Sequence, residues 1–280
     1  QPNAMGGREV GGLANTLAAH MDFEPDNQDR VKRFWGGEQI ATAPGRMAVD
    51  MFEAIERGEI KAVWIMATSP VVSLPNADLV KRALEKCELV IVSDCVADTD
   101  TLRLANIKLP ATGWAEKDGT VTNSERCISR QRALLPKAGE AQHDWWALTQ
   151  VAQRMGFAEH FAYQTQADIF REHAALSGFE NGEAEGERRR DFDISELATL
   201  SEQDYNSLSP FYWPRPSSPS QCPAIQEDQG KKRFFSNGNF FTANKKARFV
   251  PITPSEPVND VSLRYPLRMN TGRIRDQWHT

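Results

Sequence analysis

The chain has 280 residues, and its 33 Lys and Arg against 38 Asp and Glu give a formal net charge of −5. This length allows one large domain or two ordinary ones with a sizeable core. A mildly acidic chain lacks the broad positive field of a nucleic-acid-binding protein. No apolar run reaches the roughly 20 residues needed to cross a bilayer. We therefore expect neither a nucleic-acid partner nor a membrane span.

Four scattered cysteines, Cys87, Cys95, Cys127 and Cys222, form no C-x-x-C pair. This spacing argues against a zinc or iron–sulfur cage within the chain and against a dense disulfide framework. We expect reduced thiols and a cytoplasmic location. Because the first residue is Gln1 rather than Met, we also expect the chain to be part of a longer polypeptide.

The first half of the chain alternates helical and strand patterns. Apolar residues at helical spacing followed by Gly58 predict a helix over 47–57, and the apolar run 62–67 predicts a buried strand. Asn76 is expected to cap a second helix, which leads to a strand at 89–92. Strand, helix and strand in so short a span predict a right-handed parallel unit.

The pattern continues with a helix near 98–105, a strand at 107–110 and a helix over 144–155. The inner face of the last helix is predicted to consist of Leu148, Val151, Ala152 and Met155.

Beyond residue 177 the composition changes. A charge-dense stretch begins at about 178, and 209–230 is rich in Pro, Ser and Gln, so we expect a surface excursion there. Short hairpins are expected around Asn237-Gly238 and Asn244, and 265–270 resembles a first strand. The predicted fold is α/β, a Rossmann-like parallel sheet with flanking helices. The predicted domains are 1–177 for the α/β domain, 178–262 for the irregular, hairpin-rich segment, and 263–280 for the start of a further domain that the chain does not complete.

The predicted strands end in polar residues, where open parallel sheets bind ligands. Ser69 follows the first strand, and Ser93 and Asp94 follow the second. A carboxylate such as Asp94 can accept hydrogen bonds from a guanine edge or from ribose hydroxyls. Capping of the next helix explains Asp94 equally well.

Other polar residues have a functional and a plainer interpretation. Arg8 lies among paired glycines and can present a fork of donors to a planar oxyanion, or it is a surface arginine. Lys117 can contact phosphate or belong to a solvated turn, and Asp144 can be a simple helix N-cap. Thr271, Gly272 and Arg273 form a turn suited to phosphate or pterin groups, whereas His279 has no partner spaced to share a metal.

No Ser/His/Asp triad and no phosphate-binding G-x-x-x-x-G-K-[ST] loop are present. The residues by themselves predict an α/β domain that binds a nucleotide-like ligand at its strand ends.

Five segments in register carry a family resemblance: Q-P-N-A-M-G-G-R-E-V-G-G, W-I-M-A-T-S-P, V-S-D, W-A-E-K-D-G-T-V-T-N-S-E-R and N-T-G-R-I-R-D-Q-W-H-T. Together they resemble the large subunit of the molybdopterin oxidoreductase family, above all its assimilatory nitrate reductases. The resemblance covers essentially the whole chain, and it implies that 263–280 is the start of a C-terminal dinucleotide-binding β-barrel domain. It implies reduction of nitrate to nitrite, with an electron-donor protein or reductase subunit as partner.

The same resemblance implies a molybdenum ion held by two molybdopterin guanine dinucleotides, with an iron–sulfur cluster delivering electrons. Arg8 would orient nitrate near the metal, with Gln1 beside it. The residues implied to bind the cofactor are Ser69, Ser93, Asp94, Lys117, Asp144, Thr271, Gly272, Arg273, Trp278, His279 and Thr280.

The chain departs from the family pattern at two positions. Ser69 stands where the family commonly has the Asn of T-N-P, and Cys127 stands where a second arginine is frequent. The family's cysteine cluster and molybdenum ligand match no residue here, so we expect the chain alone to be inactive. A formate dehydrogenase of the same family and a non-catalytic nucleotide-binding module are the alternatives.

Overall fold

The computed structural model describes residues 3–37, 39–182, 190–217, 235, 237–254, 256 and 260–268. Its strands are β1 (Ala62–Met66), β2 (Leu89–Asp94), β3 (Ile107–Pro110), β4 (Gly119–Thr122), β5 (Cys127–Gln131) and β6 (Phe211–Tyr212). Its α-helices are α1 (Ala4–Glu9), α2 (Pro25–Trp35), α3 (Ala48–Glu56), α4 (Pro70–Ser73), α5 (Ala77–Lys86), α6 (Asp144–Ala152), α7 (Gln166–Gly178) and α8 (Glu202–Ser207). Shorter helical turns are η1 (Leu102–Leu104), η2 (Trp114–Glu116), η3 (Gln153–Phe157) and η4 (Ser195–Leu197).

The first body is built on a parallel sheet in the order β1-β2-β3, which confirms the predicted α/β class. The register pairs Ile65 with Val92 and Ser93 with Leu109, so the polar strand ends lie next to each other. Helices α3 and α5 pack together and bury Phe52 and Leu84 against the sheet. The strands form here because wholly apolar runs can be buried on both faces of a sheet.

The two predicted helices of this body are confirmed. Helix α3 ends where Gly58 adopts a positive φ of 77°. At α5, the Asn76 side chain accepts a hydrogen bond from the backbone N–H of Leu79 at 3.3 Å, as an N-cap does.

The helix expected near 98–105 is reduced to the single 3-10 turn η1. The Thr99 hydroxyl accepts from the backbone N–H of Leu102 at 3.1 Å, and Asp98 holds Arg103 through both of its oxygens. Such side-chain bonds compete with the helical backbone pattern. They explain why the sequence periodicity did not extend into a full helix.

Helix α6 forms, but the prediction of its inner face was wrong. Leu148, Val151 and Met155 are 44%, 41% and 69% exposed. Instead Thr149 is buried, and Trp145 lies one turn before it on the same face. The helix therefore turns its apolar stripe toward the surface. Gly156, with φ 97°, interrupts the helical turn that follows.

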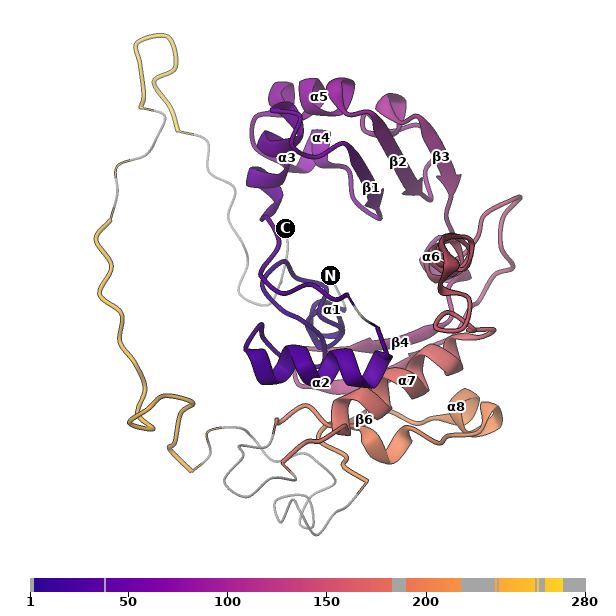
Figure 1. The fold of residues 1–280 in the computed structure, drawn as a ribbon. Helices are drawn as coiled ribbons and strands as arrows, with labels where there is room; N and C mark the ends of the chain where they lie inside the picture. The colour runs from indigo at the N-terminus through magenta and orange to yellow at the C-terminus, as the bar shows by residue number, and fades with distance from the viewer. Residues whose placement is uncertain are drawn as a thin grey trace.

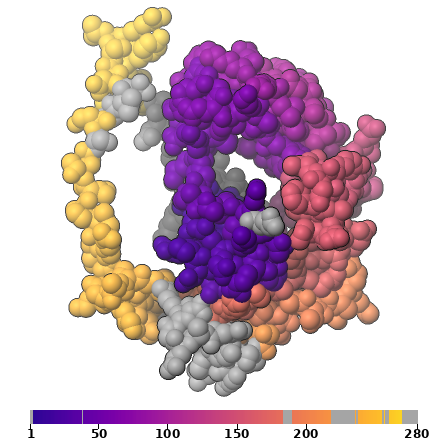
Figure 2. Space-filling model, in the orientation of Figure 1, coloured from indigo at the N-terminus to yellow at the C-terminus, as the bar shows by residue number. Residues whose placement is uncertain are grey.

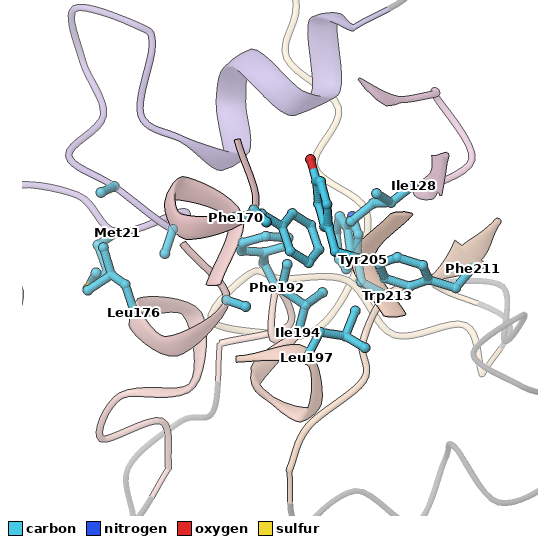
Figure 3. Packing of buried hydrophobic residues seen from close by; sticks show 14 of the residues in the cluster. Met21, Ile128, Phe170, Leu176, Phe192, Ile194, Leu197, Tyr205, Phe211 and Trp213 are labelled. Carbon is cyan, nitrogen blue, oxygen red and sulfur yellow. The ribbon is translucent and has the colours of Figure 1, made fainter. Parts of the chain in front are cut away.

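The second body has an antiparallel sheet, β4-β5-β6, and an aromatic core. Figure 3 shows Phe192 at the centre of this core, near Phe170, Tyr205 and Trp213. The core uses residues between 18 and 31 and between 128 and 213, so it includes chain on both sides of residue 178.

The interpretation of residues beyond 178 as a surface excursion was wrong for the segment around Phe192. Phe192 and Ile194 are fully buried, and Asp193 between them is 1% exposed. The Asp193 carboxylate accepts hydrogen bonds from Asn181 at 2.9 Å and from the Ser195 hydroxyl at 2.6 Å. These bonds compensate the cost of burying a charge within a core segment.

Towards the C-terminus, the described part of 235–254 forms turns, including one closed by Lys245 and Thr242, without the strands of the expected hairpins. Residues 265–268 likewise form no strand, and the rest of that expected strand lies outside the described residues. In the described part of the chain, no helix combines the length and apolar character that crossing a membrane requires.

Helix α1 packs on the second body, on the side that faces the parallel sheet (Figure 1). The arrows of β1, β2 and β3 point toward the side on which α1 lies (Figure 1). The space-filling view shows a hollow between the purple-to-magenta sheet body and the indigo N-terminal region below it (Figure 2). The carboxyl ends of the parallel strands and α1 thus border the same region of the molecule.

His173 on α7 gives this core a pH dependence. Burial and, second, the charge of His20 together lower the pKa of His173 to about 4. An unfolded histidine titrates near about 6.5, so below that pH the unfolded chain binds a proton that the folded chain refuses. Stability should therefore fall, on the order of 2 kcal/mol, as the pH drops from 6.5 toward 4. Urea denaturation at pH 7 and pH 4.5 should show that His173→Gln loses less free energy of unfolding at the lower pH than the wild-type chain does. Equal losses in the two proteins would exclude His173 as the cause.

Candidate functional site

A cleft of about 380 Å³ opens at the carboxyl ends of β2 and β3, beside the start of α6. Its lining combines apolar backbone-rich segments with a few polar side chains, as small-molecule sites generally do. The lining residues are Ser93, Leu109, Pro110, Ala111, Glu140, Gln142, Asp144, Trp146 and Ala147. Of the residues predicted from the sequence, Ser93 and Asp144 meet here.

Ser93 is held in place from the neighbouring strand. It is 3% exposed, and its hydroxyl oxygen accepts a hydrogen bond from the indole N–H of Trp64 at 2.8 Å. Because the hydroxyl hydrogen is not used by this bond, Ser93 keeps a donor.

Asp94 and Ser69 engage in local bonds instead. The Asp94 carboxylate accepts from the backbone N–H of Val96 at 3.0 Å, which stabilises the turn after β2. The Ser69 hydroxyl pairs with the buried Thr101 hydroxyl at 2.9 Å. Neither residue lines the cleft.

Lys117 and Asp144 form the charged part of the site. Their Nζ and Oδ2 atoms are 2.9 Å apart, with side chains 31% and 26% exposed. Asp144 is the first residue of α6 rather than its N-cap, a position that His143 occupies. A carboxylate in the first turn is favoured by the helix dipole. Its second oxygen, Oδ1, is buried and has no hydrogen-bond partner among the described residues.

Positive charge borders the same cleft. Lys137 donates to the side-chain oxygen of Gln142 at 2.7 Å. Burial lowers the pKa of His143, and the charges of Lys137 and Lys117 lower it further. His143 is therefore a neutral partner for the Thr112 hydroxyl, which lies 3.0 Å from its Nδ1. The charged groups at the cleft are thus Lys117 and Lys137 beside the lining carboxylates Asp144 and Glu140.

Arg8 lies apart from this cleft, in the last turn of the short helix α1. It is exposed, and its guanidinium forms no hydrogen bond or ion pair with the described residues. Desolvation lowers the pKa of His20 and the charge of Arg8 lowers it further, so the two side chains are within electrostatic reach. Arg8 is thus a cation free to bind an anion.

The turn that follows α1 requires glycine. Gly11 has φ 75°, and a Cβ there would lie 1.4 Å from the carbonyl oxygen of Leu17. Gly12 donates its backbone N–H to the Gly7 carbonyl at 2.7 Å. The paired glycines therefore fold the chain sharply back after Arg8.

Sequence reasoning missed Gln142, Trp146, Glu140 and Lys137, which are scattered polar or aromatic residues of ordinary type. Proximity to Asp144 was the only available signal. Gln1 and the predicted residues Thr271, Gly272, Arg273, Trp278, His279 and Thr280 lie outside the described residues. Among the described residues, no three His, Cys, Asp or Glu side chains gather as metal ligands.

A cleft at the carboxyl ends of a parallel sheet is the place where α/β proteins bind small ligands, so the fold and this cleft define an α/β ligand-binding protein. The sequence model of the family described as Molybdopterin oxidoreductase matches residues 3–154, more than half of the chain. The chain belongs to this family.

Curated relatives match over the entire chain. A nitrate reductase of Klebsiella oxytoca is 52% identical over 100% of this chain and 30% of its own length. A nitrate reductase of Shewanella frigidimarina is 48% identical over 100% of this chain and 29% of its own. The assimilatory nitrate reductase catalytic subunit of Bacillus subtilis is 30% identical over 100% of this chain and 37% of its own length. The chain thus spans about a third of the length of these relatives.

Proposed function

We propose that the chain is part of a molybdenum-dependent nitrate reductase catalytic subunit, which binds two molybdopterin guanine dinucleotides and reduces nitrate to nitrite. The observation that carries this proposal is the 52% identity over all 280 residues to a nitrate reductase. An iron–sulfur cluster, an electron-donor protein or reductase subunit and a cytoplasmic location belong to the same proposal. When bound, the molybdenum cofactor supplies the two-electron redox chemistry, and the protein positions it.

The cleft beside α6 offers a hydrogen-bond acceptor, a hydrogen-bond donor and positive charges that a guanine dinucleotide could use. Oδ1 of Asp144, which is buried and has no partner among the residues that the structure describes, can accept from the N–H groups of a guanine edge. The Ser93 hydroxyl retains its donor, and Lys117 and Lys137 supply charge for phosphate. We assign Ser93, Lys117 and Asp144 to this ligand.

The remaining predicted residues keep their proposed roles on weaker support. Asp94 and Ser69 already form local hydrogen bonds, so they would contact the cofactor only through oxygen lone pairs or hydrogens that these bonds do not use. Gln1 and the residues between Thr271 and Thr280 remain predictions. Arg8 is exposed and forms no ion pair with the described residues, so its charge suits the attraction and orientation of nitrate.

The direct test is to load the full-length parent protein with molybdenum cofactor and reduce it with an artificial donor. Nitrite formation from nitrate is expected. Formate oxidation by a dye, without nitrite formation, would move the protein to the second candidate, which is favoured by the 27% identity to an F420-dependent formate dehydrogenase subunit alpha of Methanocaldococcus jannaschii. Binding of guanine nucleotide without either activity would favour a non-catalytic module.

Lys117 provides a test of the cofactor cleft. Lys117→Ala removes a phosphate contact and leaves Asp144 without its cation, so we expect cofactor retention to fall about tenfold. The measurement is molybdenum and guanine nucleotide content per chain after dialysis. Lys61→Ala is the matched control, because Lys61 forms an exposed ion pair with Glu88 at 3.0 Å, far from the cleft in the fold. Equal cofactor content in both variants would remove Lys117 from the site.

A further inference from the structure

Glu9, next to Arg8 in α1, is a buried carboxylate to which none of the roles above is assigned. It is 2% exposed. Its Oε2 accepts a hydrogen bond from the Thr122 hydroxyl at 2.7 Å, and its Oε1 accepts one from the indole N–H of Trp213 at 2.7 Å. Burial raises the pKa of Glu9, and these two hydrogen bonds oppose that shift. A buried acid with both oxygens bound is a strong, directional anchor.

Thr122 holds α1 at both ends. Its backbone N–H donates to Oδ1 of Asn3, the residue before the helix, at 2.9 Å, while its hydroxyl donates to Glu9, the last residue of the helix. The carbonyl oxygen of Glu9 also accepts from the backbone N–H of Ala19 at 2.9 Å. Because a helix of six residues is too short to be stable by itself, its position depends on these contacts.

The anchor fixes the direction of Arg8. Consecutive helical residues point about 100° apart, so a Glu9 side chain held inward obliges Arg8 to point away from the core. Trp213 is itself rigidly packed, with its ring 5.3 Å from Phe192 and 5.6 Å from His20. The side chain that holds Glu9 therefore also packs on the histidine that senses the Arg8 charge.

We propose that Glu9 is a positioning residue, which holds α1 against Thr122 and Trp213 so that Arg8 is aimed at the substrate anion. This proposal rests on the proposed nitrate reductase function. It assigns to Glu9 no contact with nitrate. A negative charge beside an anion site is in itself unfavourable, so the benefit of Glu9 must come from geometry.

The experiment compares Glu9→Ala and Glu9→Gln in the cofactor-loaded full-length enzyme. Glutamine can still accept from Trp213 and can donate to the Thr122 oxygen, so Glu9→Gln should keep the nitrate KM within about threefold. Glu9→Ala should raise the KM at least about tenfold, with kcat less affected and molybdenum content unchanged. Amide exchange over residues 4–10 should accelerate in Glu9→Ala and remain near the wild-type rate in Glu9→Gln.

Two further variants keep the test decisive. Thr122→Val removes the hydroxyl but preserves the volume and the backbone bond to Asn3, so it should raise the KM by a smaller factor even if Glu9→Ala folds poorly. Glu159→Ala removes an exposed glutamate that follows η3 and should change neither measurement.

The outcomes separate the possible roles of Glu9. If both Glu9 variants lowered the KM equally, Glu9 would act only through its charge and the proposal would be overturned. Faster exchange in Glu9→Ala with an unchanged KM would overturn it too, since Glu9 would then only stabilise α1. A wild-type enzyme that forms no nitrite would refute the nitrate function instead, while the exchange rates would still show whether Glu9 anchors α1.

Discussion

Replacing Arg8 with alanine in the full-length enzyme should lower kcat/KM for nitrate by a factor of about 10² to 10³, which corresponds to roughly 3 to 4 kcal/mol of transition-state stabilisation. The reason is electrostatic. Under the proposed function, nitrate would enter a site that also holds the negative phosphates of the cofactor, and Arg8 is a cation that no carboxylate of the described residues neutralises. Steady-state kinetics with an artificial electron donor would measure the loss.

Two variants make this result specific. Arg8→Lys keeps the charge but loses the planar fork of donors, so we expect a loss of about tenfold. Arg154→Ala is the control, because Arg154 is an exposed arginine whose bonds to the described residues all go to Gln150, one turn before it. An Arg8→Ala enzyme with unchanged KM and kcat would remove Arg8 from the substrate site.

Much of the sheet body could be predicted from the sequence, because its signals are local. The runs at β1 and β2 are apolar over consecutive residues, and Asn76 precedes its helix at capping distance. These patterns depend on neighbours a few positions apart, which the sequence displays directly. The same holds for the polar strand end at Ser93, which the structure places in the cleft.

The errors and omissions arise where distant residues decide the outcome. Glu9 bonds to Trp213 across 204 positions and to Thr122 across 113, so nothing near Glu9 in the sequence indicates that it is buried. Phe192 follows a charged stretch, yet tertiary packing draws it into the core. For α6, the apolar stripe is exposed in the described structure because Trp145 and Thr149 face inward instead.

Phe192 is the position at which we expect the largest loss of stability. It is fully buried, and its ring lies 5.2 Å from those of His20 and His173 and 5.3 Å from that of Trp213. Truncation to alanine removes the centre of this aromatic cluster, so Phe192→Ala should cost about 3 to 5 kcal/mol. Native-state hydrogen exchange of the α7 amides in the full-length protein would measure the change in opening free energy.

The same substitution should reach the substrate site through Trp213. When the ring of Phe192 is absent, Trp213 loses a packing partner and holds Glu9 less firmly, so amide exchange in α1 should also accelerate. Phe192→Leu retains most of the apolar volume and should cost no more than about 1.5 kcal/mol, with a small effect on α1. Faster exchange in α7 with no change in α1 would show that the aromatic core and the Arg8 helix are energetically independent. Acceleration of both would show that one buried cluster stabilises the core and the helix that carries Arg8.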